Sequence, residues 1–229
     1  MSMELITNHP LFGIVLSILA YTLAQSLYRR WLWIHPLFIC SGSIIVFLVA
    51  MQIPYEAYES GAKYISVLLG PATVALGVPL YQHRALIRKH LRIILPAIIV
   101  GSLAGLISVI VLVGLLSGSR EILLALLPKS VTSPIAIEIG RRLGAIPELS
   151  AVFAVLTGLL GSMFGATLLR SLGIKSDLAI GIAIGTASHG IGTAKIIRES
   201  AVLGSLSSFA MALAGILVSL LFIPLYYLF

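Results

Sequence analysis

Two ionisable side chains, Lys129 and His189, lie inside long apolar stretches of the sequence. A lysine in the interior of a bilayer costs at least roughly 2.5–3.5 kcal/mol, so its ammonium group normally pairs with an anion or faces water. A carboxylate ligand is one such partner. A histidine changes its charge near neutral pH, and it can donate a hydrogen bond to a carboxylate or carry a proton. The two side chains therefore indicate a site for a small carboxylate inside a membrane.

Each of these residues also has a structural alternative. Lys129 can pair with Glu138, or it can extend its ammonium group toward the outer surface. His189 can be a packed side chain that bonds to a backbone carbonyl. Glu138 itself precedes Arg141 and Arg142 by three and four residues, a spacing that predicts an ion pair at a helix end. A role for Glu138 as a proton site is the weaker interpretation.

The surroundings of Lys129 predict an interrupted helix. The residue lies in the string PKSVTSP, between Pro128 and Pro134. Each proline removes a backbone donor and disfavours helical geometry in the residue before it, so a regular helix cannot continue through the string. Ser133 suits an N-cap and Pro134 suits the first turn of a second half-helix. The positive end of that half-helix would face the gap and attract an anion.

The surroundings of His189 predict a second interruption, in the string GTASHGIGT at residues 185–193. Closely spaced glycines and hydroxyl side chains in an apolar stretch indicate unwound backbone, which must line a polar cavity or be buried in protein. Hydroxyl groups can also satisfy backbone groups inside membrane helices. The complete candidate binding site is Lys129, Ser130, Thr132, Ser133, Thr186, Ser188, His189, Gly190, Gly192 and Thr193.

The composition places these residues in a membrane protein. Of 229 residues, 59% are hydrophobic and 10% are charged, whereas soluble domains carry roughly 25% charged residues. At about 20 apolar residues per spanning helix, the chain has room for roughly seven or eight crossings and for no soluble catalytic domain. The sequence has no HExxH, P-loop or dinucleotide-binding motif. We therefore expect no enzymatic activity, no cofactor and no metal.

The predicted fold is all-α: a polytopic transmembrane helical bundle that forms one integral membrane domain over residues 1–229. Eight apolar segments give about eight crossings, of which the two near 128–134 and 186–193 are broken. The segments cover approximately 10–28, 32–51, 64–81, 93–116, 121–140, 148–169, 178–197 and 204–228. The alternative is that one broken segment is a re-entrant hairpin, which gives seven or fewer crossings and shifts the later loops.

The basic residues predict the orientation. The formal net charge of +7 is assigned to cytoplasmic loops and not to nucleic-acid binding. With the N-terminus outside, the cytoplasmic ends receive Arg29, Arg30, Arg84, Arg88, Lys89, Arg92, Arg141, Arg142, Lys195 and Arg198. The outer ends receive Lys63, Arg120, Arg170 and Lys175. The run from His83 to Arg92 is then a cytoplasmic loop that touches anionic lipid headgroups.

Small residues complete the pattern. Cys40 is the only cysteine, so no intrachain disulfide is possible, and we interpret it as a packing residue. Three pairs of glycines have the GxxxG spacing that permits helices to approach closely. The pairs are Gly101 and Gly105, Gly161 and Gly165, and Gly181 and Gly185.

The interrupted segments resemble those of the LrgB/CidB family of bacterial membrane proteins. The strings that carry the resemblance are PKSVTSPIAIEIG at 128–140, VFAVLTGLLG at 152–161 and GTASHGIGTAKI at 185–196. The resemblance extends over essentially the whole chain and is strongest in its second half. It implies a multi-pass protein of the bacterial inner membrane, beside a small LrgA/CidA-type membrane partner.

The resemblance implies two competing functions. Family members have been tied to autolysis and to the export of murein hydrolases. Plant relatives with fused LrgA-like and LrgB-like parts are plastid carriers of glycolate and glycerate, and some bacterial systems move pyruvate. The broken segments and their buried charges favour a carrier of 2-hydroxy or 2-oxo monocarboxylates (pyruvate, lactate, glycolate or glycerate). The alternative is an antiholin-like regulator of murein hydrolase activity that acts through membrane assembly. Close-packing glycines are compatible with a homodimer, although the sequence does not determine the oligomeric state.

Overall fold

The computed structural model describes residues 7, 9–30 and 35–226, and every regular element in those ranges is helical. Within these ranges, five helical stretches are long and apolar enough to cross a membrane. They are Leu11–Arg29, Tyr55–Gln82, Arg84–Leu115, Pro147–Ser171 and Ala201–Phe222. The chain is therefore an all-helical membrane protein. It divides into two compact units, Met1–Ala75 and Leu76–Phe229, and the expectation of one integral membrane domain stays a prediction.

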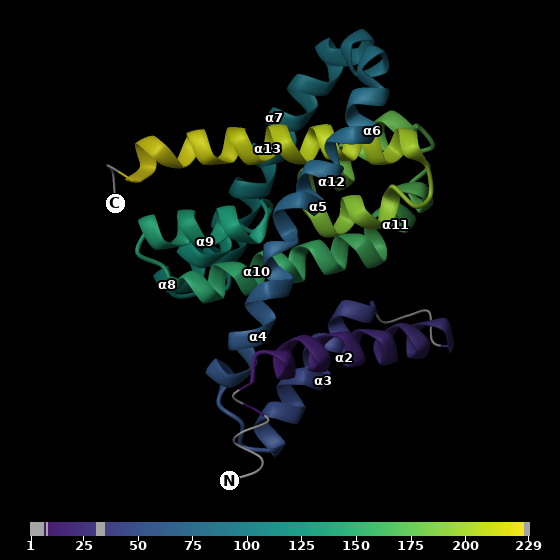
Figure 1. Cartoon of the computed structure of the whole chain (residues 1–229). Coiled ribbons are helices and arrows are strands. Elements are labelled where there is room, and N and C mark those ends of the chain that lie inside the picture. The colour runs from purple at the N-terminus through teal and green to yellow at the C-terminus, as the bar shows by residue number, and fades with distance from the viewer. Residues whose placement is uncertain (1–6, 8, 31–34, 227–229) are drawn as a thin grey trace. The chain divides into compact units, whose positions relative to one another are not determined.

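The first unit contains a small helical core. Its helices are α2 (Leu11–Arg30), α3 (Pro36–Ala50), α4 (Tyr55–Val67) and α5 (Leu69–Ala75) (Figure 1). Cys40 is a free cysteine that is buried in the same cluster as Ala24 and Ile44, which confirms its interpretation as a packing residue. Gly13 lies so close to the backbone of α4 that a Cβ there would overlap the carbonyl oxygen of Tyr58.

The second unit contains both interrupted segments. Its elements are α6 (Gly77–Gln82), α7 (Arg84–Leu115), α8 (Arg120–Leu126), α9 (Ser133–Arg142), α10 (Pro147–Leu160), the π-helix η1 (Gly161–Gly165), α11 (Ala166–Ser171), α12 (Asp177–Ile196) and α13 (Ala201–Tyr226). The side chains of Ile94 and Ile98 in α7 are fully buried, in one cluster with Ala210 of α13 and Ile182 of α12.

The basic run from Arg84 to Arg92 forms the first turns of α7, so its prediction as a loop is wrong. Arginine, lysine and leucine are good helix formers, and the sequence has no glycine or proline between Leu80 and Leu95. The apolar helix that follows is therefore extended by the polar run.

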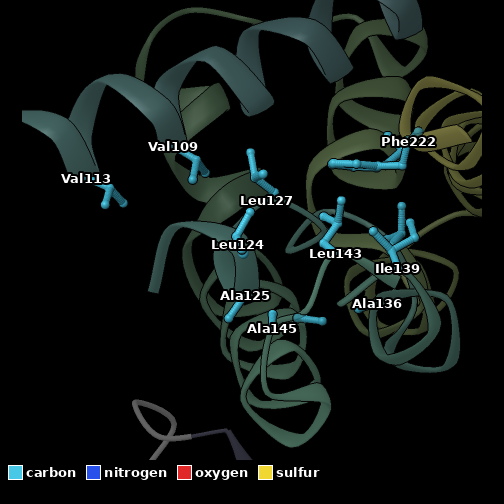
Figure 2. Close-up of a cluster of buried hydrophobic side chains, with 13 residues drawn as sticks. Val109, Val113, Leu124, Ala125, Leu127, Ala136, Ile139, Leu143, Ala145 and Phe222 are labelled. Carbon is cyan, nitrogen blue, oxygen red and sulfur yellow. The ribbon is translucent and has the colours of Figure 1, made fainter. Parts of the chain in front are cut away.

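The first interruption separates α8 from α9 at residues 127–132, where the sequence places it. The N-cap of α9 is Thr132 and not Ser133, which is already helical, and Pro134 occupies the first turn. Both halves bury side chains in one cluster: Leu124 from α8 and Ile139 from α9, together with Phe222 of α13 (Figure 2).

The second interruption is a reversal of the chain. His189 has φ 39° and ψ −134°, a left-handed conformation that no helix can contain. A Cβ built on Gly192 would lie 2.9 Å from Cγ2 of Ile184 and 2.5 Å from Cβ of Ser188. Residues eight apart in a straight helix are separated by about 12 Å, so α12 must fold back on itself. We call residues 177–196 the α12 hairpin and residues 188–190 its tip.

The contacts with α13 confirm the reversal. The first half of the α12 hairpin approaches Ser207 through Gly185, and the second half approaches the same residue through Thr193. Gly204, near the start of α13, contacts Ile197, just beyond the end of the hairpin. The two halves of the hairpin therefore run in opposite directions along the same part of α13.

An ion pair closes the base of the hairpin and corrects the predicted topology. Nη2 of Arg170, which precedes α12, lies 2.7 Å from Oε2 of Glu199, which follows it. Arg170 and Arg198 are predicted on opposite sides of the membrane, and a 2.7 Å contact to the neighbour of Arg198 is incompatible with that placement. Segment 178–197 returns to the end where it began, as in the re-entrant alternative.

Candidate functional site

The His189 ring occupies a space that glycine creates. Its Nε2 lies 2.9 Å from the carbonyl oxygen of Ala154 in α10. A carbonyl only accepts hydrogen bonds, so Nε2 must carry the proton. A Cβ built on Gly158 would lie 2.8 Å from Cε1 of the ring. The Nε2 atom therefore forms the bond to a backbone carbonyl that the structural alternative for His189 predicts. The other ring nitrogen, Nδ1, has no hydrogen-bond partner within residues 35–226.

Ser188 lies against the π-helix η1. A Cβ on Gly161 would overlap Oγ of Ser188, and a Cβ on Gly165 would lie 2.6 Å from Cδ1 of Ile184. Both glycines are therefore packing positions for the hairpin, as their spacing predicts. Ser162, between them, is buried, and its Oγ has no hydrogen-bond partner in the part of the chain that the structure describes. A π-helix is the kind of local widening that often occurs at functional sites.

Thr193 stabilises the reversal. Its Oγ1 donates a hydrogen bond to the carbonyl oxygen of His189 at 2.6 Å, and it lies 2.7 Å from Oγ of Ser207. The first contact is a bond from a side chain to the carbonyl four residues earlier, at the residue where the chain reverses. The second joins the hairpin to α13. The side chain of Thr193 is fully buried, so these contacts are its whole polar environment.

Lys129 does not form an ion pair with Glu138, which is one of its two structural alternatives. Glu138 accepts from Arg141 at 2.9 Å and from Arg142 at 2.8 Å, which confirms the predicted pair at the end of α9. The Nζ of Lys129 lies 3.4 Å from Oγ of Ser130, and its side chain is half-buried. In the described part of the chain, the ammonium group has no carboxylate partner.

Helix α7 contacts both interrupted segments on one face. A Cβ on Gly101 would lie 3.4 Å from Cγ2 of Thr186, and a Cβ on Gly105 would lie 3.6 Å from Oγ of Ser130. Residues four apart share a face of a helix and are separated by about one turn. Thr186 and Ser130 therefore approach neighbouring turns of α7. His189 faces α10 instead, and no contact between it and Lys129 is formed among the described residues.

One further side chain at this place is not predicted from the sequence. Ser102, the neighbour of Gly101, is 5% exposed, and its Oγ has no hydrogen-bond partner among the described residues. Thr186 is 6% exposed, and within the same residues its Oγ1 is equally without a partner. A buried hydroxyl that lacks a partner costs free energy unless a water or a ligand satisfies it. In the sequence, this serine lies in the string GSLAG at 101–105. The GxxxG spacing of that string predicts helix packing, so Ser102 is not singled out as a binding residue.

The remaining residues of the predicted site lie where α9 begins and where the α12 hairpin reverses. Thr132 and Ser133 begin α9, and the structure gives neither side chain a capping bond. Gly190 follows the reversal, and a Cβ there would lie 3.8 Å from Sδ of Met211. Gly192 leaves room for Ile184 of the opposite half of the hairpin. These positions shape the two interruptions and bring the hydroxyl groups to α7 and α10.

The comparisons with known proteins cover almost the whole chain. The model of the LrgB-like family matches residues 17–228, and the chain belongs to this family. YxaC of Bacillus subtilis is 38% identical over 208 residues, which cover 90% of each chain. No solved structure matches the chain.

Two relatives have names that describe a function. The holin-like protein CidB of Staphylococcus epidermidis is 33% identical over 218 residues, which cover 94% of this chain and 95% of the relative. The antiholin-like protein LrgB of Bacillus cereus is 32% identical over 223 residues, which cover 96% of each chain. The family resemblance predicted from the interrupted segments is thus confirmed.

Proposed function

We propose that this member of the LrgB-like family is a carrier of small 2-hydroxy or 2-oxo monocarboxylates such as pyruvate, lactate, glycolate and glycerate. One observation carries the proposal: polar groups from separate segments lie beside neighbouring turns of α7. Oγ of Ser130, which accepts from the half-buried ammonium group of Lys129, approaches Gly105, and Thr186 approaches Gly101. Within the described residues, the buried hydroxyl groups of Thr186 and of Ser102, the neighbour of Gly101, have no hydrogen-bond partner. Broken helices that present polar groups to a common site are a recurring design of secondary transporters.

The chemistry of these groups fits a short carboxylate. Lys129 supplies the positive charge, and α9 begins beside it with unsatisfied backbone N–H groups that favour an anion. The hydroxyl groups of Ser130 and Thr186 can donate to the carboxylate or to the oxygen at carbon 2. Ser188 and His189 line the tip of the α12 hairpin, and movement of that hairpin would open the site to one side. Coupling to a proton through Nδ1 of His189 is part of the proposal.

Because α12 is a hairpin, the basic residues that precede it and those that follow it lie at the same end of the unit. The orientation in the membrane is therefore inferred again from this arrangement. The cluster that buries Ile87 near the start of α7 includes Leu178 and Val202, which begin α12 and α13. This end of the unit carries the basic residues Arg84, Arg88, Lys89, Arg92, Arg170, Lys175, Lys195 and Arg198. A second cluster joins Val113 near the end of α7 and Phe222 near the end of α13 to Leu124 of α8 and Leu143 after α9, so Arg120, Arg141 and Arg142 lie at the other end. The positive-inside rule therefore places the base of the hairpin in the cytoplasm and Arg141 and Arg142 outside.

Uptake by proteoliposomes tests the carrier. The purified protein, with and without an LrgA/CidA-type partner, is expected to take up labelled pyruvate, lactate, glycolate or glycerate in a saturable way. Lys129→Gln should reduce uptake at least about tenfold, whereas Lys175→Gln, which removes an equal charge from the cytoplasmic end, should not. Absence of uptake of all four acids, with and without partner, would refute the substrate class. Equal uptake by the two variants would refute the site.

A second candidate function is antiholin-like regulation of murein hydrolases through membrane assembly. The names of the Bacillus cereus and Staphylococcus epidermidis relatives, antiholin-like and holin-like proteins, favour it. It predicts a stoichiometric complex or leakage of large solutes that is insensitive to replacement of Lys129 and His189. Release of a trapped fluorescent dextran from the same proteoliposomes separates it from the carrier, which must retain the dextran while it takes up pyruvate. Both candidates place the protein in the inner membrane of a bacterium, as a homodimer or beside a small membrane partner.

A further inference from the structure

The first turns of α7 carry a row of arginines on one side of the helix. Arg84, Arg88 and Arg92 are four residues apart and exposed, and Lys89 is exposed beside them. The guanidinium group of Arg84 lies 4.2 Å from the ring centroid of Tyr81 and donates to its carbonyl oxygen at 3.0 Å. We call Arg84, Arg88 and Arg92 the basic stripe. Residues at this spacing follow one another along a helix face, so the charges form a continuous row.

The basic stripe is held in place by the helix that carries it. The side chain of Ile87, between the arginines in sequence, is 4% exposed and lies in a cluster with Leu206 and Ala210 of α13. Leu91 packs against the same cluster. The stripe is therefore part of a packed helix whose apolar side is fixed, and its side chains project from a rigid backbone.

The length of α7 places the stripe beside lipid headgroups. A helix of 32 residues is about 48 Å long, whereas the hydrocarbon core of a bilayer is about 30 Å thick. The residues after Arg92 are apolar and suffice to cross that core. The first nine residues then extend through the headgroup layer, where long arginine side chains reach phosphate groups.

The charges of the stripe are not neutralised within the protein. None of Arg84, Arg88, Lys89 and Arg92 forms an ion pair with a carboxylate of the described ranges. Arg141 and Arg142, at the opposite end of the unit, share the carboxylate of Glu138. The two ends thus differ in the number of basic residues and in whether a carboxylate pairs with them.

We propose that the basic stripe of α7 is a binding site for the phosphate groups of anionic phospholipids, independently of the transported substrate. Planar guanidinium groups bind phosphate oxygens in pairs, and a row of them four residues apart matches a lipid surface better than a single small anion. Zwitterionic lipids offer the same phosphate with a compensating cation, so they bind less tightly. The site fixes the depth of the cytoplasmic end of α7 in the membrane.

Lipid titration of the purified full-length protein tests the proposal. Short-chain phosphatidylglycerol or phosphatidylcholine is added to detergent micelles, and native mass spectrometry measures the lipid that stays bound. Wild-type protein should prefer phosphatidylglycerol. The variant Arg88→Gln/Arg92→Gln should lose roughly fivefold in affinity for each charge removed at low salt. Arg88→Lys/Arg92→Lys keeps the charge but not the planar guanidinium groups, so it should recover only part of the loss.

A matched variant and two competitors decide the outcome. Arg141→Gln/Arg142→Gln removes the same number of charges from the other end and should keep the preference of the wild type. An equal loss in this variant would mean a general charge effect and would overturn the proposal. Displacement of phosphatidylglycerol by millimolar pyruvate or inorganic phosphate would also overturn it, because the stripe would then be a site for soluble anions. Uptake of pyruvate is measured separately, so a failure of the carrier proposal leaves this test intact.

Discussion

Nε2 of His189 and the carbonyl oxygen of Ala154 are 2.9 Å apart, although 35 residues separate them in the sequence. The bond joins the tip of the α12 hairpin to α10, and it requires a glycine at position 158 to make room for the ring. The tip is therefore held by a hydrogen bond. The ring fits against α10 because position 158 has no side chain. The other ring nitrogen is left for a ligand or a proton.

Replacement of His189 should separate its two roles. His189→Ala removes the hydrogen bond to Ala154 and leaves a cavity beside Gly158, so it should lower the free energy of unfolding by about 1–3 kcal/mol. His189→Gln keeps a donor in nearly the same place, so it should fold like the wild type but lose at least about tenfold in pyruvate uptake. Thermal unfolding and proteoliposome uptake measure the two effects. Wild-type uptake by His189→Gln would show that the ring only packs.

Addition of one methyl group to Gly161 should displace the hairpin. A Cβ at this position would overlap Oγ of Ser188, and overpacking of this kind costs about 1–3 kcal/mol. Gly114→Ala is the matched control in α7, because a Cβ there meets nothing within 4 Å and alanine favours the helix. Denaturation in mixed micelles should therefore show opposite signs for the two substitutions. A neutral effect of Gly161→Ala would contradict the close contact between η1 and the hairpin.

The bond between Thr193 and Ser207 should couple the hairpin to α13. A double-mutant cycle of Thr193→Val and Ser207→Ala measures the interaction between the two side chains. Hydrogen bonds between membrane helices contribute about 0.6 kcal/mol on average and up to roughly 2 kcal/mol. We expect a coupling energy within this range, since both side chains are fully buried. Strict additivity of the two substitutions would show that they do not interact.

The unpartnered hydroxyl groups should matter for binding and not for folding. Ser102→Ala removes a hydroxyl that has no partner within residues 35–226, so stability should be unchanged or slightly increased, while KM for the carboxylate should rise several-fold. Ser108→Ala is the control on the same helix, because Oγ of Ser108 bonds to the carbonyl oxygen of Gly105 at 2.7 Å and is exposed. The same KM for both variants would remove Ser102 from the site.

The sequence predicts where the helices are interrupted but not what the chain does there. Pro128, Pro134 and the glycines around His189 have local effects on the backbone, which a sequence displays directly. The fold-back of α12 is invisible to hydropathy, because two short antiparallel halves have the same apolar length as one crossing. The direction of the chain after His189 depends on Thr193 and on contacts with α13, which are distant in the sequence.

Part of the candidate site is also predicted from the sequence, because some of its residues are unusual in their local context. Lys129 and Thr186 stand out because polar residues are rare inside apolar segments. Ser102 does not, since a single serine in a membrane helix commonly bonds to its own backbone. Only the neighbouring contact of Gly101 with Thr186 brings that serine to an interrupted segment.

Labelling from each side of the membrane tests whether α12 is a hairpin. Cys40→Ser gives a background without cysteine, and Lys175→Cys, Arg198→Cys and Arg142→Cys are introduced into it one at a time. A maleimide that cannot cross membranes is applied to intact cells and to inverted vesicles. We predict that positions 175 and 198 react only in inverted vesicles and that position 142 reacts only in intact cells. Reaction of positions 175 and 198 from opposite sides would contradict the hairpin and, with it, the proposed site.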